Sequence, residues 1–335
     1  MSLALLADIG GTNARFALAD LQLRAPLLND SLRQYEVAQF ASLADAARHY
    51  LAAMPESAAG IGSAVFAVAG RVDGDEARIT NHPWVISRRA LQQSLGLQQL
   101  LLVNDFAAQA MAIPLLAGDD LIGIGAPLLP TNRATSATYA VIGPGTGLGV
   151  SALIVRDGHC LALETEGGHV GFAAATAEES AIVQRLALRF GRASNERLLS
   201  GGGLLNIHRA LSEIDGETAL ELRPQDVTAG ADAGDARCQR TVAIFCAAFG
   251  AIAGDLVLTL GAWDGVFLTG GLVPKLLPDM QASAFRARFE AKGRFAPAMA
   301  RVPTLAVVHP HAGLLGAAAF AIEDARTQRP VATFG

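Results

Sequence analysis

The sequence predicts an α/β protein built from two similar halves, each with a mixed sheet flanked by helices. Short apolar runs typical of buried strands alternate along the chain with segments of helical spacing. A glycine-rich turn between two strand-like runs occurs near the N-terminus and again at residue 143. This repeated form suggests an old duplication, and a length of 335 residues is typical of about two domains.

The elements of each half follow from local patterns of apolar residues and of turn residues. In the first half we expect strands at 3–8, 15–20, 64–70, 76–80 and 100–103, and helices at 42–54, 87–95 and 106–113. In the second half we expect strands at 139–142, 150–155, 266–269 and 304–308, and helices at about 177–190, 194–214, 234–260 and 313–322.

The composition indicates a large buried core, since 51% of the residues are hydrophobic. The formal net charge is -5 and no basic patch stands out, so a nucleic-acid partner is not expected. Cys160, Cys238 and Cys246 are too few and too widely spaced for a disulfide framework or a zinc cluster. These observations favour a reducing, cytoplasmic location.

One segment without charge, residues 241–254, resembles part of a membrane span. A span needs about 20 residues, however, and this segment is shorter. Asp255 would lie inside any longer span at a cost of roughly 2.5–3.5 kcal/mol. We therefore expect a buried core helix here and no membrane association. The apolar run at 3–7 is too short for a signal peptide.

The first glycine turn, residues 8–13, reads Asp-Ile-Gly-Gly-Thr-Asn. Glycine lets backbone amides approach a phosphate closely because no Cβ stands in the way. Asp8, at the end of the strand, can hold Mg²⁺ through water, since Mg²⁺ usually keeps several waters. An ordinary hairpin turn is the alternative.

The second turn, residues 143–149, contains four glycines and the hydroxyl of Thr146. Residues 147–152 also match the G-x-G-x-x-A dinucleotide fingerprint, but that motif must open a helix and the residues that follow favour a strand. Neither Lys275 nor Lys292 follows a glycine, which excludes a Walker A loop. A phosphoryl transfer in this chain must therefore rely on backbone amides and Mg²⁺ to neutralise charge.

Three polar elements are candidates for binding a polyol. Asn104-Asp105 lies where an apolar strand meets a helix, so Asp105 could accept a hydroxyl proton; a helix N-cap is the alternative. Glu166 and His169 flank two glycines, which disfavours a helical di-metal motif and leaves a polyol-binding loop or a plain surface turn. Glu196 begins a helix, where an acid is also favoured by the helix dipole alone.

Taken together, these motifs resemble the bacterial glucokinase family of the sugar-kinase, heat-shock and actin superfamily. The resemblance runs from about residue 3 to Gly316. The motifs that carry it, in the order seen in that family, are Asp8–Thr12, Thr80-Asn81-His82, Asn104-Asp105-Phe106, Gly143–Gly149, Glu166–Val170, Glu196–Gly201 and Leu268–Gly271.

The resemblance implies a glucokinase that transfers the γ-phosphoryl group of ATP to the 6-hydroxyl of D-glucose, with Mg²⁺. The first phosphate loop would contain Ala7, Asp8, Ile9, Gly10, Gly11 and Thr12, and the second Gly143, Gly145, Thr146 and Gly147. Gly270 and Gly271 would lie near the adenosine. Glucose would be held by Asn104, Asp105, Glu166, His169 and Glu196, with Asp105 as the catalytic base.

The same resemblance implies a two-domain actin-like ATPase (ribonuclease H-like) fold and a homodimer. The small domain would contain residues 1–115 and 310–335, and the large domain residues 116–309, with the active site in the cleft between them. Two details depart from the family pattern. Ala7 replaces a glycine, and Gly201-Gly202-Gly203 replaces a form with proline in the middle. The cysteine-rich zinc motif of the related repressor/kinase family is absent.

Four alternatives remain open at this point. The chain could phosphorylate another hexose or an amino sugar, or it could be a catalytically dead sugar-binding paralogue. A sugar-sensing DNA-binding regulator would need a helix-turn-helix segment, and the first expected strand at Leu3 leaves no room before it. An actin-like filament protein could share the phosphate loops but would have no need of the sugar-facing acids.

Overall fold

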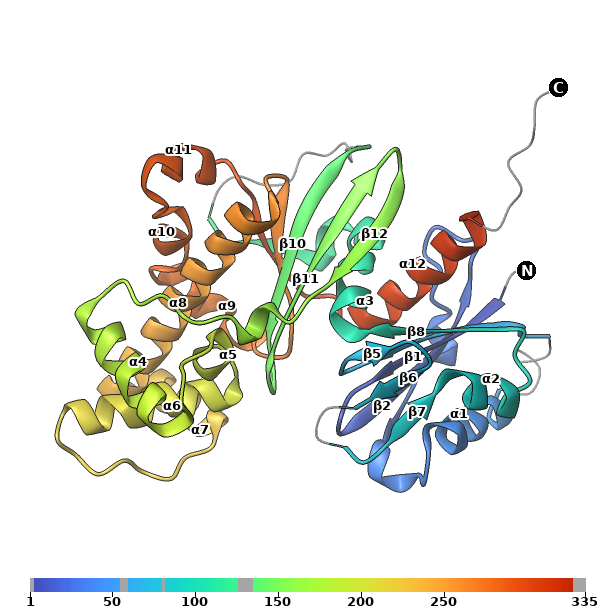
Figure 1. Cartoon of the computed structure of the whole chain (residues 1–335), viewed down its shortest axis with the longest axis horizontal. Helices are drawn as coiled ribbons and strands as arrows, with labels where there is room; N and C mark the ends of the chain where they lie inside the picture. Colours follow the sequence, from blue (N-terminus) through green and yellow to red (C-terminus); the bar gives the residue numbers. More distant parts are fainter. Residues whose placement is uncertain (1–2, 55–59, 80–81, 126–134, 328–335) are drawn as a thin grey trace. The chain divides into compact units, whose positions relative to one another are not determined.

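The computed structural model of the protein describes residues 3–54, 60–79, 82–125 and 135–327 (Figure 1). The chain forms two compact units. Unit 1 contains residues 1–118, 157–164 and 309–335, and unit 2 contains residues 119–156 and 165–308. Nothing in the sequence pattern indicated that residues 157–164 group with the first unit. The expected small domain extends to residue 335, and its last eight residues lie outside the described part.

Unit 1 is built on a five-stranded sheet in the order β3-β2-β1-β4-β8. Its strands are β1 (Leu3–Ile9), β2 (Asn13–Asp20), β3 (Arg33–Glu36), β4 (Ser63–Val68) and β8 (Gln99–Asn104). The hairpin β1–β2 and the pair β2–β3 are antiparallel, whereas β1, β4 and β8 run parallel. The sheet is therefore mixed, as the sequence predicts.

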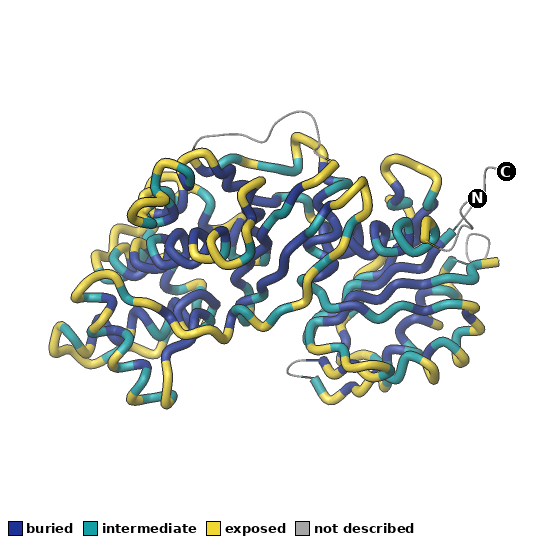
Figure 2. The backbone as a smooth tube through the Cα atoms, turned by 45° about the horizontal axis from the view of Figure 1, so that its top comes forward, coloured by how far each residue is buried: buried dark blue, intermediate teal, exposed yellow. Residues whose placement is uncertain are grey.

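Both faces of this sheet are covered. Alternate residues of β1 belong to different apolar clusters, with Leu5 on one face and Leu6 on the other. The Leu5 cluster includes α1 (Leu43–Ala52) and α2 (Arg88–Ser94), and the Leu6 cluster includes α3 (Asp105–Ala112) and α12 (Ala312–Thr327). Figure 2 shows the central strands buried between more exposed layers. The remaining strands of unit 1 are β5 (Val72–Asp73), β6 (Glu76–Arg78), β7 (Val85–Ser87) and β12 (His159–Glu164).

Within unit 2 the strands follow the order β11-β10-β13-β14-β9, and β9 is antiparallel to β14. These strands are β11 (Leu148–Arg156), β10 (Ala137–Pro144), β13 (Gly265–Leu268), β14 (Thr304–Val307) and β9 (Leu121–Gly123). A glycine hairpin, β10–β11, is again followed by parallel strands, β13 and β14. The helices are α4 (Ala177–Phe190), α5 (Asn195–Leu198), α6 (Gly201–Ile214), α7 (Pro224–Asp232), α8 (Ala236–Leu260), α9 (Val273–Ala282), α10 (Phe285–Glu290) and α11 (Ala296–Met299).

The helix α8 explains the uncharged segment of the sequence. It has 25 residues, and length and composition alone would let it cross a membrane, but 78% of its most apolar window is buried inside the protein. Gly250 packs against the backbone of Phe285, so α8 and α10 lie in close contact. The prediction of a buried core helix is confirmed.

The predicted helix at 194–214 is wrong in one respect, because the structure divides it into α5 and α6. Ser200 stands between them and caps α6, since its hydroxyl accepts a hydrogen bond from the Gly203 amide at 2.9 Å. The chain therefore turns at Leu199, which gives Glu196 a short helix of its own. The prediction of a strand at 76–80 falls partly on Thr80, which lies outside the described residues.

Candidate active site

The carboxyl edge of the unit 1 sheet brings two predicted elements together. Ile9 pairs with Val68, and Val68 pairs with Asn104, so these three parallel strands end in register. The first glycine turn and Asn104-Asp105 therefore leave the sheet at the same edge. Ligands of open α/β sheets bind outside the carboxyl ends of strands.

Asp8 is the acidic group of this edge. Its carboxylate lies 3.4 Å from the Arg15 guanidinium, and its side chain is 19% exposed. Burial raises the pKa of Asp8, while the positive charge of Arg15 acts in the opposite direction. Gly313, at the start of α12, leaves room for this carboxylate, because a Cβ there would lie 2.8 Å from Asp8 Oδ2.

As a metal ligand, Asp8 would act as a single carboxylate that holds Mg²⁺ through water. Among the described residues, no group of three or more acidic, histidine or cysteine side chains could hold a metal ion. A single partly exposed carboxylate suits Mg²⁺, which usually keeps several waters and binds phosphate oxygens.

The first glycine turn is closed by a hydrogen bond from the Gly10 amide to the Asn13 carbonyl at 2.9 Å. Among the described residues, none accepts a hydrogen bond from the backbone amides of Gly11 and Thr12. Ala7 and Ile9 are wholly buried, so they pack in the core beneath the turn and do not face solvent. The turn therefore offers backbone donors of the kind that bind phosphate.

Asn104 is the N-cap of α3. Its side-chain oxygen accepts hydrogen bonds from the amides of Phe106 at 2.9 Å and Ala107 at 3.1 Å, and its amide nitrogen donates to the Gly70 carbonyl. The alternative of a helix cap is therefore correct for Asn104. Asp105 is the first residue of the helix, where the dipole favours a negative charge.

In unit 2, the second glycine turn contacts the start of α6 and the segment Gly270-Gly271. The Gly145 amide donates to Gly147, and the Gly201 amide donates to the Gly145 carbonyl at 2.9 Å. Gly270 has a φ of 89°, and a Cβ there would lie 2.6 Å from the Pro144 carbonyl oxygen. The structure thus brings together Gly143–Gly147, Gly270-Gly271 and the start of α6.

The loop that contains Glu166 and His169 and the helix that contains Glu196 both contact the backbone of Leu148, directly after the second turn. Gly168 packs against the Leu148 carbonyl, while the Leu148 amide donates to Glu196 Oε2 at 2.9 Å. Glu166 and His169 lie 3.9 Å apart, and 69% and 59% of their side chains are exposed. The chain segments that carry these three polar groups therefore both lie against the strand that follows the second glycine turn.

Arg15 is a residue of this region that sequence reasoning did not single out. It stands directly opposite Asp8 in the β1–β2 pairing. Counting outward from the predicted hairpin turn would have placed it there. Of the predicted motif at residues 80–82, Thr80 and Asn81 lie outside the described residues, while His82 packs edge-on against Trp84.

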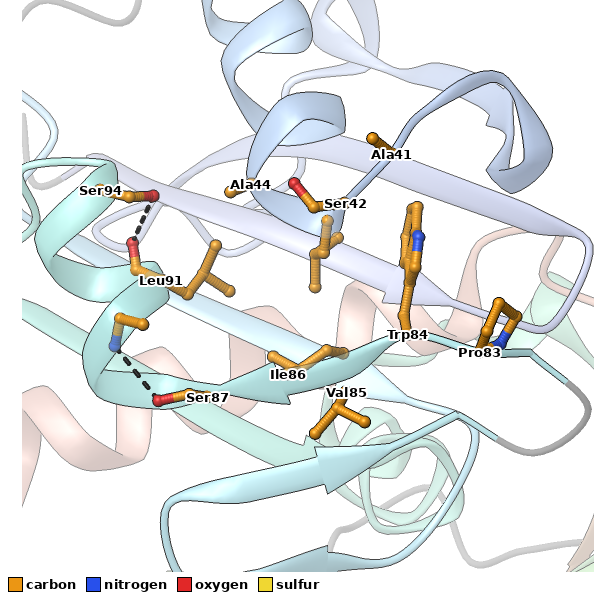
Figure 3. Close-up of a pocket in the computed structure, with 12 residues that line it drawn as sticks. Ala41, Ser42, Ala44, Pro83, Trp84, Val85, Ile86, Ser87, Leu91 and Ser94 are labelled. Carbon is orange, nitrogen blue, oxygen red and sulfur yellow. Dashed lines mark hydrogen bonds between the residues drawn. The ribbon is translucent and has the colours of Figure 1, made fainter.

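A cavity of about 370 Å³ in unit 1 lies elsewhere, beside α1 and the segment from Pro83 to Ser94 (Figure 3). It is lined largely by apolar side chains such as Leu43, Trp84 and Leu91. None of the predicted site residues contributes to its wall. The predicted site residues of each unit therefore lie outside this cavity.

The comparison with known families decides the relationship. The model of the family described as glucokinase matches residues 5–324. The chain belongs to the glucokinase family. A glucokinase of Stenotrophomonas maltophilia (strain R551-3) is 62% identical over 329 residues, which cover 98% of this chain and 97% of that protein.

Solved structures agree with this membership. A glucokinase from an Antarctic psychrotroph has a TM-score of 0.85 and 33% identity, and the match covers 96% of this chain and 98% of that one. A ROK family glucokinase from Streptomyces griseus, solved with glucose and AMPPNP, has a TM-score of 0.64 and 20% identity, with 95% and 98% covered. The second likeness concerns the fold alone. The fold is thus the actin-like ATPase fold of these sugar kinases.

Proposed function

We propose that the chain is an ATP-dependent glucokinase that phosphorylates the 6-hydroxyl of D-glucose. The observation that carries this proposal is the 62% identity to a glucokinase over 98% of the chain. The geometry supports it, because each unit places a glycine turn beside polar side chains suited to a polyol.

In this proposal Asp105 orients the 6-hydroxyl and accepts its proton. General-base help of this kind is typically worth about 10²–10⁴-fold. The capping bonds of Asn104 fix its orientation and leave one amide hydrogen for a sugar oxygen. Glu166, His169 and Glu196 would bind other hydroxyls. A site built to bond hydroxyl groups rejects analogues that lack one.

The phosphates of ATP would lie against the two glycine turns, with Thr146 as a hydroxyl donor and Gly270-Gly271 near the adenosine. Asp8 would hold Mg²⁺ through water, and that ion would neutralise phosphate charge. The transfer is expected to be in line through a loose transition state, so positioning and electrostatics dominate. We further propose a homodimer, a cytoplasmic location, and the division into domains 1–115 plus 310–335 and 116–309.

The deciding experiment is a coupled assay for glucose 6-phosphate with wild type and Asp105→Ala. We expect the wild type to turn over D-glucose and the variant to lose about 10²–10⁴-fold in kcat while keeping its melting temperature. Asp73→Ala, which removes a 79% exposed acid of the same unit, is the matched control and should change nothing. Near-normal turnover by Asp105→Ala would reject the assignment of the base.

A panel of sugars tests the substrate. If another hexose or an amino sugar is phosphorylated with a higher kcat/KM than glucose, that sugar replaces glucose in the proposal. If no sugar is phosphorylated and none shifts the melting temperature, the chain is not a sugar kinase. Ligand at about 100 times Kd should add about 2.7 kcal/mol of stability, so a binding-only paralogue would still be detected.

A further inference from the structure

Glu196 is held against the second glycine turn by its side chain. Its Oε2 accepts the Leu148 amide hydrogen at 2.9 Å, and Leu148 is the first residue after the turn. The side chain is partly exposed, and no described residue donates a hydrogen bond to Oε1. One carboxylate oxygen is therefore fixed by the turn and the other is open to a ligand.

Gly147, the residue before Leu148, lies against the Glu196 carboxylate. A Cβ on Gly147 would lie 2.5 Å from Glu196 Oε2 and 3.3 Å from its Cδ. Gly147 has an ordinary φ, so its backbone alone would accept alanine. Gly145, two residues earlier, has no atom within 4 Å of the same position. The absence of a side chain at Gly147 thus makes room for the Glu196 carboxylate.

The segment 196–201 contacts the second turn through Glu196 at one end and Gly201 at the other, and it is braced internally by Ser200. Gly201 donates to the Gly145 carbonyl, and Ser200 Oγ donates to the Glu196 carbonyl at 2.8 Å. The amides of Gly145 and Leu148 are already bonded, while those of Thr146 and Gly147 have no acceptor among the described residues. The two unbonded amides are the ones left to meet a phosphate, and Glu196 lies directly beside them.

We infer that Glu196 is a positioning residue for the nucleotide turn in addition to a ligand for the sugar. One carboxylate then links the two substrates, because a sugar hydroxyl bonded to Oε1 fixes the same group that holds Leu148 through Oε2. Sugar and nucleotide should consequently strengthen each other's binding. The inference rests on the proposed function for the sugar, but the grip on the turn exists without it.

The first test measures binding of ADP with Mg²⁺ by calorimetry in the absence of sugar. Glu196→Ala should weaken ADP about fivefold or more, which is the scale of typical coupling between sites. Glu196→Gln keeps an oxygen that can accept the Leu148 amide hydrogen, so it should restore most of the ADP affinity. Glu221→Ala is the control, because it removes an exposed acid of unit 2 outside the turn and the proposed sugar site, and ADP affinity should not change.

A double-mutant cycle on ADP affinity separates a direct contact between Glu196 and the turn from a general loss of stability. Gly147→Ala should weaken ADP in the wild type, because the new methyl group displaces the carboxylate. In the Glu196→Ala background the same substitution should cost nothing further. Melting temperatures confirm that each variant is folded.

Two results would overturn the inference. The first is unchanged ADP binding in Glu196→Ala, and the second is an equal cost of Gly147→Ala in both backgrounds. A failure of the proposed function looks different: the wild type would phosphorylate no sugar, while the cycle with ADP would still report on the turn.

Discussion

The two glycine turns share a hairpin and a parallel strand behind it, but they differ in why glycine is needed. In the second turn, a Cβ on Gly143 would lie 2.5 Å from the Thr269 carbonyl oxygen, and Gly147 is crowded by Glu196. In the first turn, a Cβ on Gly10 would lie 3.5 Å from the Asn13 oxygen, which is ordinary contact. Packing within the protein therefore demands glycine at Gly143 and Gly147 of the second turn, whereas the described atoms around Gly10 would accept a Cβ.

The largest effect on the free energy of unfolding is expected when a side chain is added in the second turn. Gly143→Ala forces the turn away from Thr269 and should cost about 3 kcal/mol, the upper end of typical overpacking penalties. Gly145→Ala is the control, since its Cβ would meet open space. Thermal unfolding of both variants measures the difference, and equal melting temperatures would show that the turn relaxes freely.

A smaller effect on the free energy of unfolding is expected from Gly313→Ala, which crowds Asp8 of the first turn. Gly313→Ala would place a methyl group 2.8 Å from the carboxylate, and shifting this side chain should cost about 1 kcal/mol. The stability should return in Asp8→Ala/Gly313→Ala, because the methyl group then occupies the freed space. If the double variant is no more stable than Gly313→Ala, the strain lies in α12 and not in its contact with Asp8.

The smallest effect on stability is expected at Gly10. Gly10→Ala should leave the free energy of unfolding unchanged or raise it by about 0.4–1 kcal/mol, because alanine restricts the unfolded chain. The affinity for ADP should nevertheless fall, since the new Cβ stands where a phosphate would approach. Calorimetry and thermal unfolding on the same preparation separate the two quantities. A clear loss of stability without a change in affinity would contradict the comparison.

Much of the fold is local in origin and is therefore visible in the sequence. The helix expected at 177–190 is found as α4 (Ala177–Phe190), and each glycine hairpin joins the two strands expected on either side of it. The single helix expected at 194–214 fails at Ser200, because the apolar spacing continues through a serine that caps a new helix. Local pattern alone does not show whether such a serine lies inside a helix or starts one.

The site was predictable only in part. The glycine turns and Asn104-Asp105 follow from strand ends and turn residues, whereas the bond between Leu148 and Glu196 joins residues 48 positions apart. Such a contact depends on how β11 and α5 pack, which no short-range pattern encodes. The same holds for Gly313 against Asp8, because α12 reaches the first turn from the far end of the chain.

The position of α12 at the end of the chain has a consequence for folding during synthesis. Leu314, Ala317, Ala318 and Ala321 of α12 belong to the apolar cluster on one face of the first sheet. A ribosome adding about 5–20 residues each second needs roughly 10–40 s to pass from residue 118 to residue 327. During that interval the emerging first sheet lacks one of its covers. The intervening unit 2 contains its own apolar cluster, so it can fold before unit 1 is complete. Unit 2, although it is synthesised after most of unit 1, can therefore complete its core first.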